Sequence, residues 1–281
     1  MSSITKAIIP VAGYGTRRLP ITKAVEKCML PIGNRPLVDY VVEDCLKAGI
    51  TDIIFVVSEQ FEQLQNYYGR NQLLEEYLKA KGKTEQLQEV KHLAKKANFH
   101  YVVQDQHQPY GTAVPVSLCA HLIKKNEQVL VLMGDDFIYR ADGRSEVAEL
   151  IKAADESGVG AGLLAVNVPR DDVFRYGVIE TDGENGVSFF KRVIEQPKVE
   201  DAPTTLINIS KYLFDYELME CAKQVMQNAP AANGEYQITE ALNMYISSGN
   251  KMVVVPAKGD YMDGGTVEGW LAANNRVVGK E

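Results

Sequence analysis

The residues best suited to chemistry lie near the start of the chain, in the segment PVAGYGTRRLPITKAVEKCMLP at residues 10–31. A short apolar stretch, residues 7–11, leads into the turn Ala12-Gly13-Tyr14-Gly15-Thr16. Glycines let the backbone approach a ligand closely, and the N–H groups of a turn after a strand can bind an anion. The turn is followed by the cations Arg17, Arg18, Lys23 and Lys27. The segment therefore predicts a site for a triphosphate.

Two common nucleotide-binding motifs do not fit this turn. A dinucleotide-binding fingerprint needs glycine or alanine at position 18, where this chain has Arg18. A P-loop of the form Gly-x-x-x-x-Gly-Lys-Ser/Thr is also absent. The remaining alternative is an ordinary glycine turn with solvated basic residues, which the continuation Lys27-Cys28-Met29-Leu30-Pro31 disfavours.

Carboxylates follow two other apolar stretches. Asp135 and Asp136 come directly after residues 129–133, and Asp263 follows residues 252–255 and precedes the last helical pattern. Mg²⁺ on a phosphate is held by carboxylates of this kind, at the carboxyl ends of strands in an open α/β sheet. Gly-Asp is also common in turns, so each carboxylate has a purely structural alternative. Together, Asp135 and Asp263 predict a magnesium site with two carboxylates.

Two further groups suit a nucleotide sugar. Gln104 ends a strand and is followed by Pro109-Tyr110-Gly111-Thr112-Ala113; an amide can pair with the imide edge of a pyrimidine, and a glycine lets the base lie against backbone. Gly177 and Glu195 lie in the second half of the chain, and a carboxylate beside a glycine backbone suits the vicinal hydroxyls of a sugar. In isolation, Gln104 and Glu195 are more often surface residues of strands.

The elements that must position these residues alternate along the chain. Apolar runs predict strands at residues 7–11, 53–57, 101–103, 129–133 and 161–168, and later at 178–180, 187–196 and 252–255. Helical spacing predicts helices at residues 37–46, 66–97 with a break at Gly82, 216–227, 237–247 and 267–278. Alternation of this kind predicts an α/β fold, Rossmann-like, with a mixed, mostly parallel sheet flanked by helices. We expect one domain, residues 1–281, with a nucleotide-facing half to about residue 168 and an acceptor-facing half from about 169.

Composition narrows the class of protein. The chain has 281 residues and a net charge of −7, so non-specific binding to nucleic acid or to anionic membrane is not expected. Its 4 cysteines form no CxxC pair and its 4 histidines show no metal spacing, so reduced thiols are expected and zinc is disfavoured. The start MSSITKAIIP lacks the apolar core of a signal peptide, and no apolar run reaches membrane-spanning length. A soluble, cytoplasmic protein is expected.

In order and together, these segments resemble the bacterial UTP–glucose-1-phosphate uridylyltransferases, within the sugar-1-phosphate nucleotidyltransferase superfamily and its glycosyltransferase-A-like fold. The resemblance covers nearly the whole chain, and the stretch 74–90 is similar to an insertion of the uridylyl branch. By this resemblance Arg17, Lys27 and Asp135 are catalytic. The nucleotide contacts that it implies are Ala12, Gly13, Gly15, Gln104, Gly111 and Asp136. It also implies that Asp135 and Asp263 bind Mg²⁺, and that Gly177 and Glu195 contact the sugar.

The activity implied is transfer of a uridylyl group from UTP to glucose 1-phosphate by in-line attack assisted by Mg²⁺, giving UDP-glucose and pyrophosphate. A homo-oligomer, dimer or tetramer, is expected. One alternative is a glucose-1-phosphate thymidylyltransferase, which the Gly111-Thr112-Ala113 variant fits. Another is a weakly active regulatory paralogue that binds nucleotide sugar.

Three positions depart from the family pattern. Pro109-Tyr110-Gly111-Thr112-Ala113 is closer to thymidylyl relatives, and Ser210-Lys211-Tyr212 stands where the family usually has Gly-Arg-Tyr. Gln196 stands where it usually has a lysine for the sugar phosphate. If the segment is extended, Lys198 shares a face with Gln196, so both are predicted to bind the sugar phosphate.

Overall fold

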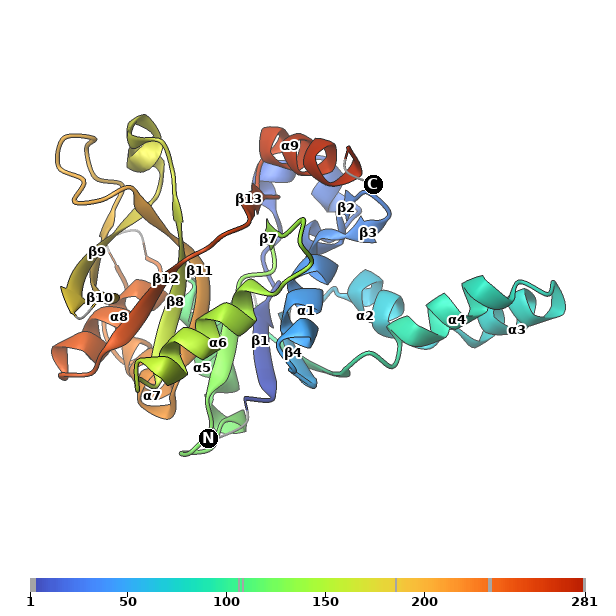
Figure 1. The fold of residues 1–281 in the computed structure, drawn as a ribbon. Helices are drawn as coiled ribbons and strands as arrows, with labels where there is room; N and C mark the ends of the chain where they lie inside the picture. Colours follow the sequence, from blue (N-terminus) through green and yellow to red (C-terminus); the bar gives the residue numbers. More distant parts are fainter. Residues whose placement is uncertain (1–3, 106, 108, 185, 232–233, 280–281) are drawn as a thin grey trace.

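The computed structural model describes residues 4–105, 107, 109–184, 186–231 and 234–279 (Figure 1). The described residues form one nine-stranded sheet, two small two-stranded sheets and helices that cover the large sheet. The order of strands across the large sheet is β5 (Asn98–Val103), β4 (Asp52–Val57), β1 (Lys6–Pro10), β6 (Val129–Leu132), β11 (Leu206–Phe214), β8 (Ala161–Asn167), β12 (Met252–Pro256), β10 (Val187–Glu195) and β9 (Gly177–Glu184).

The expectation of a mostly parallel sheet holds only for the first half of the chain. Strands β5, β4, β1 and β6 are parallel to one another. Strand β11 runs antiparallel to both of its neighbours, β6 and β8, and β10 runs antiparallel to β9 and β12. No helix intervenes between β9, β10 and β11 in the described residues, and antiparallel strands need no crossover helix between them. The sheet is therefore mixed.

Both faces of the sheet are covered, as the alternation along β1 shows. Ala7 and Ile9 pack on one side and Ile8 on the other, and all three are fully buried. A strand buried on both faces is apolar at every position instead of at alternate ones. Helices α1 (Leu37–Lys47), α6 (Glu146–Glu156) and α9 (Val267–Val278) contribute to the first layer, and α5 (Ala113–Cys119), α7 (Tyr216–Val225) and α8 (Ile238–Ser247) to the second.

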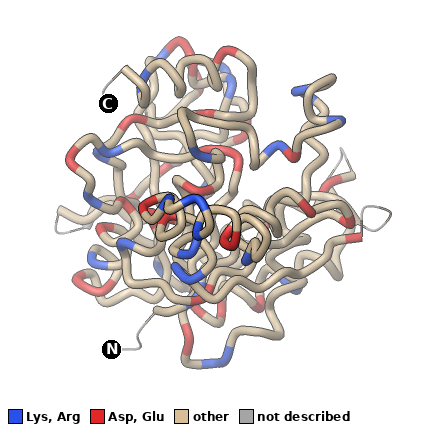
Figure 2. Tube along the Cα trace, turned by 90° about the vertical axis from the view of Figure 1, so that its right-hand side faces the viewer, with Lys and Arg blue, Asp and Glu red and all other residues tan. Residues whose placement is uncertain are grey.

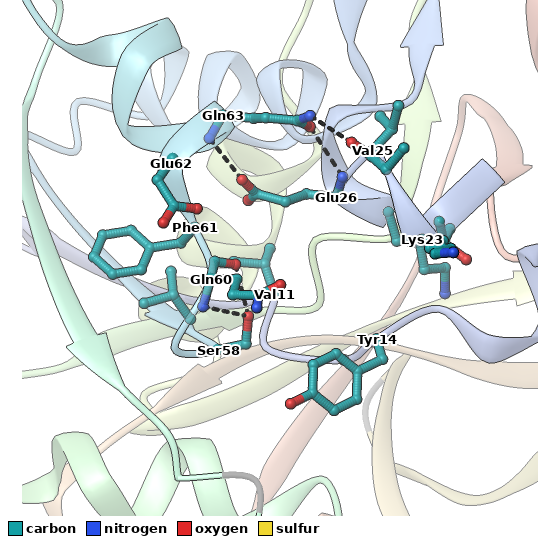
Figure 3. Close-up of a pocket in the computed structure, with 15 residues that line it drawn as sticks. Val11, Tyr14, Lys23, Val25, Glu26, Ser58, Gln60, Phe61, Glu62 and Gln63 are labelled. Atoms are coloured by element: carbon teal, nitrogen blue, oxygen red, sulfur yellow. Dashed lines mark hydrogen bonds between the residues drawn. The ribbon is translucent and has the colours of Figure 1, made fainter. Parts of the chain in front are cut away.

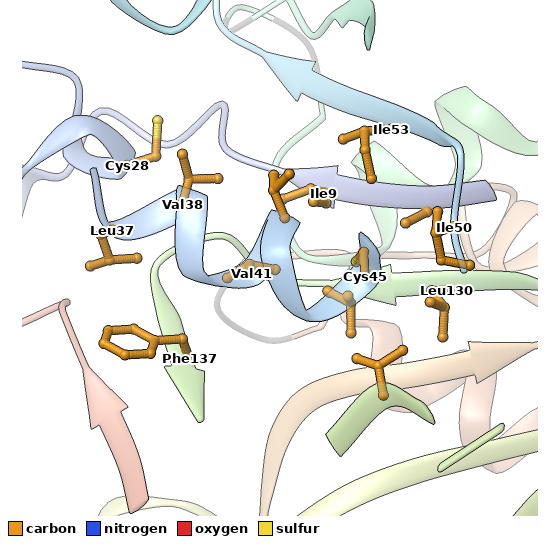
Figure 4. Packing of buried hydrophobic residues seen from close by; sticks show 14 of the residues in the cluster. Ile9, Cys28, Leu37, Val38, Val41, Cys45, Ile50, Ile53, Leu130 and Phe137 are labelled. Carbon is orange, nitrogen blue, oxygen red and sulfur yellow. The ribbon is translucent and has the colours of Figure 1, made fainter. Parts of the chain in front are cut away.

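Helix α1 shows how the apolar spacing builds this core. Leu37, Val38, Val41 and Cys45 form a buried stripe that faces residues of β1, β4 and β6 (Figure 4). The helix also packs on β7 (Asp136–Tyr139), where the ring of Tyr40 stacks on Phe137 with centroids 4.4 Å apart. Strand β7 pairs with β13 (Asp260–Asp263), and β2 (Pro31–Ile32) pairs with β3 (Arg35–Pro36).

Helices between β4 and β5 extend away from the sheet (Figure 1). They are α2 (Glu62–Tyr68), α3 (Gln72–Ala80) and α4 (Thr84–Leu93). The predicted break at Gly82 is confirmed, because this residue has a φ of 67° between α3 and α4. The predicted start at residue 66 is wrong, since α2 begins earlier and is a separate helix.

The other predicted strands and helices are confirmed to within a few residues, but the sequence analysis missed α5, α6, β7, β11 and β13. The turn between β9 and β10 includes Asn185, which lies outside the described residues. Strand β11 has no continuous apolar run in its sequence. Its pairing with β8 is also irregular between Asn208 and Tyr212, where Ser210 has a φ of 52°.

Lys and Arg residues are interspersed with Asp and Glu residues along the trace (Figure 2). Positive charge at a phosphate site must therefore come from particular side chains and not from a basic face. The cysteines are unpaired, as expected, with Cys28, Cys45 and Cys119 buried. Among the described residues, no helix is both long and apolar enough to cross a membrane.

Candidate active site

A cavity of about 520 Å³ lies where the parallel strands end. The segments after β1, β5 and β6 open into it, which is the edge where open α/β sheets bind ligands. Most predicted nucleotide and phosphate residues line it, namely Ala12, Gly13, Gly15, Arg17, Lys27, Gln104, Gly111 and Asp135. The structure thus brings together residues from separate parts of the first half of the chain.

Glycines allow the segments around this cavity to meet. Gly15 has a φ of 64°, and a Cβ added there would lie 3.0 Å from both Lys27 Cβ and Thr22 Cγ2. The Thr22 hydroxyl donates to the Gly15 carbonyl at 2.9 Å. On the other side, a Cβ at Gly134 would lie 2.4 Å from Val11 Cγ1. The glycine turn is therefore packed against Lys27 and against the segment that carries Asp135.

Four charged groups lie close together: Arg17, Lys27 and Asp135 line the cavity, and Asp263 lies beside them without lining it. Lys27 Nζ lies 2.5 Å from Asp135 Oδ2. A Cβ added to Gly265 would lie 2.8 Å from Asp263 Oδ1, 3.5 Å from Lys27 Nζ and 3.6 Å from Arg17 Nη2. Asp263 is thus brought beside Lys27 and Arg17 at Gly265, and Asp135 joins this group through its ion pair with Lys27.

The carboxylates are held in defined orientations. The Gly265 N–H donates to Asp263 Oδ1 at 2.7 Å, and Lys27 donates to Asp135 Oδ2. Burial alone would raise the pKa of Asp135, but the charge and hydrogen bond of Lys27 hold it below the ordinary value. Within the described part of the chain, no group of three or more His, Cys, Asp or Glu residues is arranged to hold a metal ion. Any metal here would depend on two carboxylates and on the ligand itself.

Asp136 has a different environment from the one predicted for a nucleotide ligand. It is 8% exposed and does not line the cavity. The Lys211 ammonium donates to its Oδ1, and the Tyr261 hydroxyl donates to its Oδ2 at 2.9 Å. Burial raises the pKa of Asp136 to about 6. Asp136 therefore ties β7 to β11 and β13. Its side chain lies away from the cavity that Asp135 lines, because neighbouring residues on a strand point to opposite sides. We correct its predicted role accordingly.

The cluster of four cations inferred from the sequence divides in the structure. Arg17 and Lys27 line the cavity. Arg18 is buried, donates to the Thr266 carbonyl and lies 5.3 Å from the ring centroid of Trp270. Arg18 therefore fastens the loop to α9. Lys23 lines a second, smaller cavity on the other side of the glycine turn.

The part of the cavity around Gly111 is built from both halves of the chain. Gly111 has a φ of 129°, and a Cβ there would lie 2.3 Å from the Tyr236 carbonyl oxygen. The Tyr236 N–H donates to Tyr110 O at 2.8 Å, and the Ile238 N–H donates to Thr112 Oγ1 at 2.9 Å. Thr112 therefore has a structural task, holding this loop to the start of α8.

Sequence reasoning missed Glu235, a carboxylate that also lines the cavity. It comes from the second half of the chain and pairs through backbone with Tyr110 in an isolated bridge. Glu235 lies outside every motif of the sequence, so its place in the cavity could be found only from the structure. Tyr14 and Tyr110 are exposed and also line the cavity. Both lie within the predicted motifs, but the sequence predicted no role for either.

The predicted sugar contacts form a separate pair that does not line this cavity. Gly177 is paired with Glu195 across β9 and β10, and a Cβ at Gly177 would lie 3.0 Å from a Glu195 carboxylate oxygen. Burial raises the pKa of Glu195. Gln196 has a φ of 46°, so the segment is not extended and the alternation that placed Lys198 beside it does not apply. The premise for Lys198 was wrong.

Comparison with known proteins agrees with this geometry. Residues 6–279 match the family model described as nucleotidyl transferase. A protein of Methanocaldococcus jannaschii, provisionally named a UTP–glucose-1-phosphate uridylyltransferase, is 38% identical over 275 residues, covering 98% of this chain and 93% of its own length. A UTP–glucose-1-phosphate uridylyltransferase of Mycoplasma pneumoniae is 31% identical over 277 residues, covering 98% and 92%. A UDP-glucose pyrophosphorylase solved with UDP-glucose matches with a TM-score of 0.84 at 30% identity, covering 99% of this chain and 100% of that one.

The chain belongs to the nucleotidyl transferase family, and it is a nucleotidyltransferase enzyme. Its relatives include uridylyltransferases matched over nearly its whole length. The narrower expectation of a bacterial group is not supported, because the M. jannaschii relative is archaeal.

Proposed function

We propose that this enzyme transfers the uridylyl group of UTP to glucose 1-phosphate. A phosphate oxygen of the sugar attacks the α-phosphorus, the bond from that phosphorus to the bridging oxygen of the β-phosphate breaks, and pyrophosphate leaves. The observation that carries the proposal is a cavity lined by Arg17, Lys27, Asp135, Gln104 and Gly111, with Asp263 beside Lys27 and Arg17. The names and ligand of the relatives described above agree with it.

In-line transfer of this kind needs positioning and charge neutralisation more than covalent help. The glycine turn offers backbone N–H groups to phosphate oxygens, and Lys27 and Arg17 supply fixed positive charge. Because Lys27 is paired with Asp135 at 2.5 Å, an incoming phosphate competes with that carboxylate for the ammonium. The ion pair with Asp135 holds the ammonium at the phosphate site, and a bound phosphate takes the place of the carboxylate.

We further propose that Asp135 and Asp263 hold Mg²⁺. Asp135 Oδ2 accepts from Lys27 and Asp263 Oδ1 accepts from the Gly265 N–H, which leaves the other oxygen of each carboxylate for a ligand as far as the described residues go. Magnesium commonly binds one or two carboxylates together with substrate phosphates, so the donor set fits. When bound, the ion would neutralise and align the reacting phosphates.

Gln104 and Gly111 are our candidates for the uracil contacts. Gln104 is 7% exposed, and its backbone N–H donates to the Val57 carbonyl at 2.8 Å, so its backbone is fixed just after the end of β5. The thymidylyl alternative rested on the Gly111-Thr112-Ala113 variant. Thr112 binds the Ile238 backbone, which accounts for that variant without reference to the base. Gly177 and Glu195 remain our candidates for the glucose contacts.

The proposal is tested by pyrophosphate release with UTP or dTTP, a panel of sugar 1-phosphates, and Mg²⁺ or a chelator. We expect turnover with UTP and glucose 1-phosphate that the chelator abolishes. Preference for dTTP would favour the thymidylyl alternative, and nucleotide-sugar binding without turnover would favour the regulatory one. A cytoplasmic location and a homo-oligomeric state are also part of the proposal, and sedimentation of the purified protein tests the latter.

A further inference from the structure

The loop that carries Lys27 is fastened to the start of helix α2 by a reciprocal set of hydrogen bonds (Figure 3). Glu26 Oε1 accepts from the Gln63 N–H at 2.7 Å and from the Leu64 N–H at 3.3 Å. In return, Gln63 Oε1 accepts from the Glu26 N–H at 3.0 Å, and Gln63 Nε2 donates to the Ala24 carbonyl at 2.8 Å. We call this arrangement the Glu26–Gln63 clasp.

The clasp supplies a hydrogen-bond acceptor to the first N–H groups of helix α2. The first N–H groups of an α-helix have no partner within it, and a side chain at the N-cap usually supplies one. At α2 the N-cap is Phe61, whose side chain makes no capping hydrogen bond. Glu26 supplies the acceptor from a distant part of the chain. The same contact that completes the helix therefore fixes the backbone of the loop.

Lys27 is the next residue after Glu26, and it begins the 3-10 turn Lys27–Met29, for which Glu26 is the N-cap. Its side chain reaches back under the glycine turn, since a Cβ at Gly15 would lie 3.0 Å from Lys27 Cβ and 3.3 Å from Lys27 Cδ. The ammonium ends at Asp135 in the large cavity. Lys27 is thus held at its head by Asp135, and the backbone beside it is held by the clasp.

The clasp lies outside the large cavity. Glu26 and Gln63 line the smaller cavity, of about 130 Å³, while Lys27 lines both. Neither Glu26 nor Gln63 is among the residues that line the proposed substrate site. An effect of either residue on the reaction would therefore pass through the loop.

We propose that Glu26 and Gln63 are positioning residues that set the place of the Lys27 ammonium in the phosphate site. This inference rests on the proposed function. A flexible lysine loses little of its attraction for a bound anion when its backbone loosens, but it loses the alignment that the transition state requires. Loosening the clasp should therefore lower kcat much more than it raises the KM for UTP.

The test compares Glu26→Ala, Gln63→Ala, the double variant and Glu26→Gln. Gln65→Ala is the matched control, because Gln65 is an exposed glutamine on the same helix. Each protein is assayed for pyrophosphate release over a range of UTP concentrations with saturating sugar 1-phosphate, and its melting temperature is measured. Turnover by the wild type is measured first; if it is absent, the proposed function fails, and the clasp is then judged on whichever nucleotide and sugar 1-phosphate the enzyme does use.

We expect Glu26→Ala and Gln63→Ala each to lower kcat by about tenfold, with the KM for UTP changed by less than about twofold. Each change removes two of the four hydrogen bonds of the clasp. The double variant should nevertheless resemble the single ones, because we expect the loop to lose its alignment once either pair is gone. Glu26→Gln should recover most of kcat, since its amide oxygen can still accept from the two N–H groups. Gln65→Ala should match the wild type.

Three results would overturn the proposal. Variants that melt earlier but keep the wild-type kcat would make the clasp purely structural. Equal or larger changes in KM than in kcat would place its effect on ground-state binding. Losses in kcat that multiply in the double variant would mean that the two residues act separately.

Discussion

The Gly264 N–H donates to the Asp135 carbonyl oxygen at 3.1 Å, and this backbone bond joins the segments that carry the two candidate metal ligands. The approach is close, because a Cβ at Gly264 would lie 2.9 Å from that oxygen and 1.8 Å from Leu37 Cδ1. Asp263 immediately precedes Gly264 and pairs with Asp136 in the β13–β7 ladder. The two carboxylates are thus brought together by backbone, and their own side chains are not needed for the scaffold.

Asp135→Asn and Asp263→Asn should therefore keep the fold and lose the activity. Losing a metal ligand typically costs several kcal/mol of barrier, so we expect turnover to fall by about a hundredfold or more in each variant. Pyrophosphate release measures the loss, and the melting temperature should stay close to that of the wild type. Asp155→Asn, the same change at an exposed position of α6, is the control. Near-normal turnover in both site variants would exclude this metal site.

Lys27→Ala and Arg17→Ala should lower kcat more than they weaken binding of UTP, because fixed positive charge matters most as negative charge develops on the phosphates. We expect losses of about a hundredfold for Lys27→Ala, measured by steady-state kinetics. Lys23→Ala is the matched control, since Lys23 is an exposed lysine of the same loop that lines the other cavity. If Lys23→Ala were as harmful as Lys27→Ala, the effect would be one of general charge and not of position.

Gly111→Ala should damage both stability and nucleotide binding. A left-handed φ costs a non-glycine residue about 1–2 kcal/mol, and forcing a methyl group against packed atoms costs roughly 1–3 kcal/mol more. Gly143→Ala separates the two effects, because Gly143 has a φ of 71° but no atom within 4 Å of an added Cβ. Urea unfolding should show a much larger loss for Gly111→Ala. Equal losses of unfolding free energy in the two variants would mean that the loop around Gly111 can move to accommodate the methyl group and is not fixed by Tyr236.

Gln196→Lys should lower the KM for the sugar 1-phosphate without abolishing turnover. A lysine would replace neutral hydrogen bonds by charge-assisted ones, which are roughly twice as strong, so a change of about three- to tenfold is expected. Both residues bear the same backbone strain at this position, where φ is 46°. Lys198→Ala should have little effect, because the segment is not extended. A raised KM in Gln196→Lys would show that the acceptor is held elsewhere.

Asp44 should make the protein less stable as the pH rises from about 4 to about 6. Burial raises its pKa from 3.8 to about 6, against hydrogen bonds from Ser145 and the Val147 N–H that favour the charged form. The folded state then binds more protons than the unfolded state across this range, so the free energy of unfolding falls with pH. Asp44→Asn should be more stable than the wild type above pH 6, by roughly 3 kcal/mol at most. Urea unfolding at pH 5 and pH 8 measures the difference between the two proteins; a constant difference would contradict the prediction.

Local patterns in the sequence were enough to predict the parts of the site that lie next to one another along the chain. The glycine turn, Arg17 and Lys27 sit where the pattern implied, because a strand, a turn and a following cation fix their own geometry. Strands β1, β4 and β6 were predicted from local sequence too, since burial on both faces makes their central residues continuously apolar.

What the sequence could not supply were the long-range contacts. No local pattern indicates that Arg18 contacts Trp270, or that Asp136 contacts Lys211 and Tyr261. Arg18 and Asp136 were therefore assigned to the site together with Arg17 and Asp135, the residues that precede them. Strand β11 was missed because the polar residues Asn208, Ser210 and Lys211 interrupt its apolar residues. Glu235 enters the cavity only through the pairing of its backbone with Tyr110.

Because β11 lies between β6 and β8, the large sheet cannot form fully until β11 has been synthesised. Every residue proposed for the glycine turn, the cation pair and Asp135 is synthesised before β11, yet β6 has an unpaired edge until residues 206–214 are available. A fragment that stops at residue 168 would expose that apolar edge, and exposed edges of this kind promote aggregation. Pairing across such separations is also slow. We therefore expect newly made chains to remain vulnerable until the second half has emerged, and neither half to be separable as a smaller functional unit.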